Sequence, residues 1–93
     1  MTEGWVKVEA GGGEELLLQV GGIWDAPNVT RLDPQLRGLG PAANITLDLS
    51  QLERLDTAGA WLLFRTLKEY RNRGGRAEVT GLTTSIEAML EQV

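Results

Sequence analysis

The stretch NITLDLSQLERLDTAG, residues Asn44 to Gly59, decides the fold of this chain because it leads from a buried strand into a long helix. Apolar and polar side chains alternate over residues 45–50, which is the period of a strand. Leu52 and Leu55 follow in a short connection. The Thr57 hydroxyl is suited to cap the helix by accepting from a backbone N–H of its first turn. The stretch therefore predicts a strand-helix unit that holds Thr57 partly exposed, next to the positive end of a helix dipole.

The remaining pattern predicts one small α/β domain over residues 1–93. Strands are expected over residues 5–10, 15–23 and 77–81, and helices over residues 25–39, 57–73 and from 84 or 85 onward. The glycines at 11–13 indicate a hairpin turn, and no Gly-Lys-Ser/Thr follows them as a phosphate loop would require. The order β-β-α-β-α-β-α predicts a mixed four-stranded sheet that starts with a β-hairpin and has helices packed against it.

The predicted helices differ in how regular they are. The first, capped by Asp25, contains Pro34, so we expect a kink or a second start at Asp33-Pro34. In the second, one apolar stripe is expected to pack on the sheet: Ala60, Leu63, Phe64, Leu67 and Tyr70. Gly74-Gly75 should end that helix. The third, capped by Thr84 or Ser85, should bury Ile86, Met89 and Leu90, in a pattern that still runs at Val93.

The composition argues against several classes of function. A net charge of −4 lacks the basic footprint of a nucleic-acid-binding protein. The absence of His and Cys rules out Ser/His and Cys/His nucleophile pairs and thiolate metal sites. Asp48, Glu53 and Asp56 could in principle act as paired acids or hold Mg²⁺, but a strand position and a helix start explain Asp48 and Asp56 more simply. We expect no enzyme activity, no metal and no cofactor.

No segment of the chain predicts membrane insertion. The longest unbroken apolar run, residues 60–64, has five residues, far fewer than the roughly 20 that a membrane-spanning helix needs. The first residues lack the basic and apolar regions of a signal peptide. We therefore expect a cytoplasmic domain.

Three motifs in order resemble the STAS domain, the sulfate transporter and anti-sigma factor antagonist family. Asp48-Leu49-Ser50 precedes Asp56-Thr57-Ala58-Gly59 at the family's spacing, where a strand ending Asp-Leu-Ser leads to Asp-Ser-Ser-Gly or Asp-Thr-x-Gly. Gly22-Ile23-Trp24-Asp25 resembles the Gly-x-Leu-Asp pattern that ends the second strand, and Arg73-Gly74-Gly75-Arg76 resembles the Gly-Gly turn before the last strand. The resemblance covers nearly the whole chain and implies the STAS fold.

The resemblance also implies a partner-binding surface at the start of the second helix. In anti-sigma factor antagonists, a serine directly before the motif's Gly is phosphorylated by a partner kinase, but here that position is Ala58. Thr57 instead matches the threonine of Asp-Thr-x-Gly in the small subunit of Mla-type phospholipid-transport ABC systems, where it contacts the ATPase. The partner-binding residues expected from this likeness and from the helix faces are Thr57, Ala58, Trp61, Leu62 and Arg65.

Alternatives remain open for these residues. Thr57 could serve only as an N-cap, or could be the phosphoacceptor of a partner-switching pathway. Trp61 could fold over the sheet edge as extra core. For the whole domain, a ligand or nucleotide sensor is a third possible function, after the ATPase-binding module and the phosphorylated regulator. The Ala-Gly-Ala-Trp sequence of residues 58–61 resembles STAS domains fused to a lipid-transport permease, so we expect this domain to be the N-terminal part of a longer permease chain.

Overall fold

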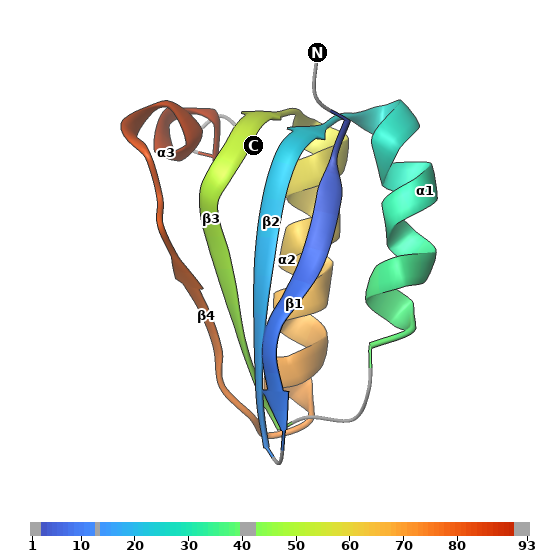
Figure 1. Cartoon of the computed structure of the whole chain (residues 1–93), viewed down its shortest axis with the longest axis vertical. Helices are drawn as coiled ribbons and strands as arrows, with labels where there is room; N and C mark the ends of the chain where they lie inside the picture. The colour runs from blue at the N-terminus through green and yellow to red at the C-terminus, as the bar shows by residue number, and fades with distance from the viewer. Residues whose placement is uncertain (1–2, 13, 40–42, 91–93) are drawn as a thin grey trace.

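The computed structural model of the chain describes residues 3–12, 14–39 and 43–90, and it consists of one sheet flanked by helices (Figure 1). The expected element order, β-β-α-β-α-β-α, is confirmed. The elements are β1 (Trp5–Gly12), β2 (Glu15–Trp24), α1 (Ala26–Arg37), β3 (Asn44–Leu55), α2 (Thr57–Asn72), β4 (Ala77–Thr80) and α3 (Thr84–Leu90).

The sheet is mixed and four-stranded, as the sequence predicted. Its strand order is β1-β2-β3-β4, with β1 antiparallel to β2 and the other two pairs parallel. Figure 1 shows α2 packed behind the sheet, α1 at the side of β1, and α3 next to the C-terminal end of β3. Parallel neighbours need a helical crossover, and α1 and α2 supply the two that this sheet requires.

β3 is twice as long as the predicted strand over residues 45–50. It continues through Leu52 and Leu55, which are buried and were expected in a connection. The reason lies in β2, which also stays extended to its end, so that Trp24 pairs with Leu55 after register irregularities near Gly21 and Gly22. The two central strands consequently end side by side, and the helices that follow them start at the same edge of the sheet.

α1 does not restart at Pro34. Asp25 caps the helix by accepting from the Asn28 N–H at 3.2 Å, as expected, and α1 then runs without interruption to Arg37. Pro34 is exposed and removes a single backbone bond near the end of the helix. Burial of Leu32 and Leu36 holds the helix together across that gap.

The buried face of α2 differs from the predicted stripe at two positions. Phe64, expected in the core, is 46% exposed, whereas Leu62, expected at the surface, is fully buried. The difference arises because α2 packs on α1 as well as on the sheet. Its buried arc is therefore broader on the α1 side and includes Leu62, and Phe64 lies beyond the opposite margin. The other four members of the stripe, Ala60, Leu63, Leu67 and Tyr70, are buried.

The end of α2 is fixed by the predicted Gly-Gly pair. Gly74 has a φ of 87° and its N–H bonds to the Arg71 carbonyl, while the Gly75 N–H bonds to the Tyr70 carbonyl at 3.1 Å. This pair of bonds is the Schellman motif, which needs a left-handed residue after the helix. The chain is thereby turned directly into β4.

Other predicted boundaries shift slightly. α3 is capped by Thr83, whose hydroxyl accepts from the Ile86 N–H at 3.2 Å, and not by Thr84 or Ser85. Ile86 is buried and Met89 and Leu90 are partly buried, as expected. Gly11 and Gly12 belong to β1 and not to the turn. α1 ends at Arg37, two residues before the predicted end, with Gly38 as its C-cap. Gly13 and residues 91–93, which bear on the predicted hairpin turn and the end of the last helix, lie outside the described residues, as do residues 40–42.

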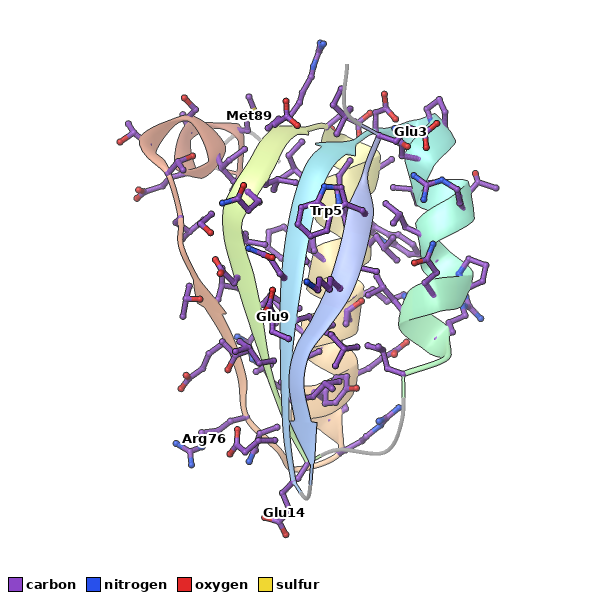
Figure 2. All side chains as sticks on the ribbon, viewed as in Figure 1. Glu3, Trp5, Glu9, Glu14, Arg76 and Met89 are labelled. Atoms are coloured by element: carbon purple, nitrogen blue, oxygen red, sulfur yellow. The ribbon has the colours of Figure 1, made fainter. Side chains whose placement is uncertain are left out.

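The face of the sheet away from α2 carries a different set of side chains. Figure 2 shows Trp5 and Glu9 on this face, and the Trp5 ring lies against Gly21 of β2. Polar residues of β3, among them Thr46 and Asp48, are half-buried there. The apolar core lies between the sheet and the two long helices. The position of α2 is therefore set by the packing of its buried side chains against the sheet and α1.

Candidate functional site

The start of α2 is capped by Asp56 and not by Thr57. Asp56 has the extended backbone of a cap residue, and its Oδ1 accepts from the Gly59 N–H at 3.0 Å. Its Oδ2 accepts from the Ala26 N–H at 3.2 Å, which ties the start of α2 to the start of α1. The prediction that Thr57 is the cap is therefore wrong, because the helix begins one residue earlier than a Thr57 cap would require. Thr57 is the first helical residue and is exposed.

Gly59 brings α2 against the end of β2. It is buried, and a Cβ placed on it would lie 2.1 Å from the Trp24 carbonyl oxygen. The Asp56 N–H also bonds to this oxygen, at 3.2 Å. The Trp24 side chain is fully buried and donates from Nε1 to the Gly21 carbonyl at 3.0 Å. A rigid backbone contact thus sets the position of Thr57.

An exposed face follows from this start along the outer side of α2. Thr57, Trp61 and Phe64 are spaced four and three residues apart, so they lie on one side of the helix. Trp61 is 57% exposed and Phe64 46% exposed. We call these three residues the aromatic face. Phe64 was missed in the sequence, although its spacing from Trp61 could have indicated it.

The other predicted site residues lie around this face in different ways. Ala58 is half-buried, at the edge of the surface. Leu62 is fully buried, so it cannot contact a partner on the surface of this fold, and the prediction that it belongs to the patch is wrong. Arg65 lies beside Trp61, with its guanidinium carbon 5.2 Å from the centre of the indole ring. The structure thus groups Thr57, Ala58, Trp61 and Arg65 near the start of α2. The second large apolar side chain that it exposes there is Phe64 and not Leu62.

Arg65 is held by a charge network between the two long helices. Its Nη2 donates to Asp33 Oδ1 on α1, and the same oxygen accepts from Arg37 Nε at 2.9 Å. The Arg65 hydrogen bond, helped by Arg37, lowers the pKa of Asp33 to about 2. Arg65 Nε lies 3.7 Å from Glu69 Oε1, and the pKa of Arg65 is raised, chiefly by Asp33. These contacts fix the guanidinium that stacks on Trp61 and so restrict the orientation of the indole.

The carboxylates considered for catalysis or Mg²⁺ do not form a cluster. Asp48 Oδ1 accepts from the Ser50 N–H at 2.9 Å, and Asp56 caps α2. The part of the chain that the structure describes contains no group of three or more His, Cys, Asp or Glu side chains suited to a metal. A shallow polar depression of about 80 Å³ lies at β2, β3 and β4, and neither Asp48 nor Asp56 lines it; its lining is Glu15, Asn44, Ile45, Thr46, Arg76 and Glu78.

No helix among residues 3–12, 14–39 and 43–90 combines the length and the apolar character needed to cross a bilayer. α2, with 16 residues, is the longest helix of the described part of the chain, and it carries charged residues on its outer side.

A family model decides which family this fold and motif represent. The model described as "Mlab, STAS domain" matches residues 8–93. The chain belongs to the STAS family. No curated protein matches it in sequence.

Solved structures agree with a STAS domain at the level of the fold. The anti-sigma factor antagonist SpoIIAA in its unphosphorylated form is 15% identical, with a TM-score of 0.75 over 95% of this chain and 79% of that chain. The phosphorylated form of the Bacillus cell fate determinant SpoIIAA is 15% identical, with a TM-score of 0.73 over 95% of this chain and 82% of that chain. A STAS domain from Rhodobacter sphaeroides, titled an antisigma-factor antagonist, is 16% identical, with a TM-score of 0.67 over 85% of this chain and 87% of that chain.

Proposed function

We propose that this STAS domain is a non-catalytic protein-interaction module that binds the ATPase subunit of a phospholipid-transport ABC system. ATP hydrolysis belongs to the partner. The observation that carries the proposal is the aromatic face, in which two large aromatic side chains stand half-exposed beside Thr57 on a rigid helix. The family model, described by the name Mlab, supports this type of transport system.

The exposed aromatics have the properties of interface anchors. Tryptophan is among the residues that most often dominate binding energy, and anchors usually occupy the centre of a contact. Trp61 leaves 57% of its surface uncovered in the folded domain, so it gains little stability from the core on that side. Its orientation is already restricted by Arg65, which reduces the entropy lost on binding.

The start of α2 adds a small polar element to these anchors. Thr57 is exposed, and the capping role expected for Thr57 is performed by Asp56. The Thr57 hydroxyl therefore remains available to a partner. Ala58 is small and lies at the edge of the same surface, which allows a partner backbone to approach closely. The proposed contact therefore consists of two aromatic anchors with a hydroxyl beside them.

A second candidate is an anti-sigma factor antagonist that is regulated by phosphorylation. It is favoured by the structural likeness to SpoIIAA, which has been solved in a phosphorylated form. Because Ala58 stands before the motif's glycine here, the acceptor would have to be Thr57. A phosphate there would add nearly two negative charges one residue from Asp56, which weakens this candidate. Fusion of this domain to a permease remains a prediction of the sequence.

Calorimetric titration of the domain into the ABC ATPase encoded beside it tests the proposal. We expect saturable binding by the wild type that is lost in Trp61→Ala and Thr57→Glu. Leu82→Ala is the matched control, because Leu82 is an apolar side chain of similar exposure, 45%, in the connection between β4 and α3. No binding by the wild type, together with phosphorylation of Thr57 by a cognate kinase, would favour the second candidate.

A further inference from the structure

The outer side of α2 changes character along its length. Its first half presents the aromatic face, and its second half presents cationic side chains. Lys68 follows Phe64 by four residues, which places it on the same side of the helix. Arg71 and Arg73 follow at the C-terminal end, and all three are exposed. We call Lys68, Arg71 and Arg73 the basic end of α2.

This basic end contrasts with the charge of the whole domain. The net charge is −4 at pH 7, yet residues 65–76 hold five of the nine Lys and Arg residues and one acidic residue. That segment carries a net charge of +4 and the remainder −8. Because Arg65 pairs with Asp33 of α1, the exposed positive charge along α2 is that of the basic end. A positive region on an acidic domain is an asymmetry that a partner surface can recognise.

The acidic residue of this segment does not neutralise the basic end. Glu69 lies on the α1 side of α2, where Arg65 Nε is 3.7 Å from its carboxylate. Arg71 donates to the Ala77 carbonyl at 3.0 Å, and the Arg73 guanidinium lies 5.0 Å from the centre of the Tyr70 ring. Arg71 and Arg73 are therefore held along the surface by uncharged groups.

We propose that the partner surface that receives the aromatic face also carries an acidic patch, which meets Lys68, Arg71 and Arg73. This inference rests on the proposed function and specifies the chemistry of its contact. The partner would present a groove with an apolar pocket for the aromatic face at one end and carboxylates for the basic end at the other. Aromatic anchors supply affinity, and the charges at the rim orient the domain and speed its association.

The charges at the opposite end of α2 favour a protein groove over an anionic membrane. Asp56 is exposed beside Thr57, and Asp25 is half-buried at the neighbouring helix start. Both carboxylates lie at the end where the aromatic side chains would have to enter a bilayer. Anionic lipid would attract the basic end and repel this acidic end, whereas a folded partner can place charges of each sign where they are needed.

Arg76 lies outside the proposed contact. Figure 2 shows it at the hairpin end of the sheet, in the same region as Glu14, and it lines the polar depression together with Glu15 and Glu78. Its positive charge is thus surrounded by carboxylates on the sheet side, unlike that of Lys68. The inference accordingly uses only the three residues of the basic end.

Charge reversal at one position tests the inference. Lys68→Glu and the matched control Lys7→Glu make the same change to the net charge, but Lys7 is exposed on β1, away from α2. We expect Lys68→Glu to slow association with the ATPase and weaken binding about five- to tenfold at about 0.05 M salt, with the difference largely lost near 0.5 M. Lys7→Glu should stay within about twofold of the wild type.

The outcomes separate this inference from the proposed function. Wild-type binding that is lost in Trp61→Ala, with equal affinities for Lys68→Glu and Lys7→Glu, would keep the proposed function and overturn the acidic patch. Absence of wild-type binding to the ATPase would refute both. Cosedimentation with vesicles rich in anionic lipid that is lost only in Lys68→Glu would assign the basic end to a membrane and also overturn the inference.

Discussion

Replacement of Gly59 by alanine should destabilise this domain, although the same change in most helices is stabilising. An alanine inside a helix is ordinarily favoured over glycine by about 1 kcal/mol. Here the new Cβ would lie 2.1 Å from the Trp24 carbonyl oxygen and 2.9 Å from a Leu55 methyl carbon, whereas real Cβ contacts are essentially never below 3.0 Å. The methyl group can move, but the carbonyl belongs to a strand end that is paired with β3.

The magnitude follows from these opposing effects. Overpacking of a rigid site destabilises by roughly 1–3 kcal/mol, and more where backbone must move. With the gain in helix propensity subtracted, we expect a net loss of about 2 kcal/mol. In a domain of this size that corresponds to a melting temperature lower by roughly 10 °C.

Thermal unfolding followed by far-UV circular dichroism measures this loss, with urea unfolding as a second measurement. Gly38→Ala is the control, because Gly38 has a φ of −85° and an added Cβ would lie 3.3 Å from its nearest neighbour, the Pro34 carbonyl oxygen. That variant should change stability by less than about 0.5 kcal/mol. A Gly59→Ala variant that melts at or above the wild-type temperature would refute the reasoning that α2 is seated by this backbone contact.

Three further predictions concern the stability of the domain. Asp56→Ala should lower the free energy of unfolding by about 1 kcal/mol and Thr57→Ala by less than about 0.5 kcal/mol in urea titrations, because Asp56 is the cap; the reverse order would contradict this. The pKa of Asp33 is lowered from 3.8 to about 2 by its hydrogen bond with Arg65, so the stabilisation is complete above pH 3.8 and disappears as the pH falls through about 2. Asp33→Asn should therefore destabilise by about 1 kcal/mol at neutral pH, with a smaller difference near pH 2, and equal differences at both pH values would exclude the network as the cause. Gly74→Ala should cost about 1 kcal/mol in the same titrations, since Gly74 has a φ of 87° with open space around it, and an unchanged midpoint would show that this turn is not constrained.

The family motif and the strand-helix periods were sufficient to predict the fold. The Asp-Thr-x-Gly stretch placed the start of α2 within one residue, and the element order and the mixed sheet are confirmed. The cap was assigned to Thr57 and not to Asp56 because either side chain can accept from a first-turn N–H. Only the three-dimensional start of the helix distinguishes these two neighbours.

The candidate site was predicted less completely, for a reason that is also physical. Helical periodicity separates one face of α2 from the other, but it does not indicate how wide the buried arc is. That width depends on α1, which packs beside α2 and covers Leu62 while it leaves Phe64 exposed. The aromatic face is thus a product of the packing of two helices.

The sequence by itself determined the family, the order of the elements and the absence of Cys and His chemistry, because these follow from local spacing and from composition. The tertiary structure alone decided that Asp56 joins the starts of two helices, that Asp33 holds the arginine beside Trp61, and that α2 exposes its aromatic side chains. Each of these features depends on contacts between residues distant in the chain, which no local pattern records.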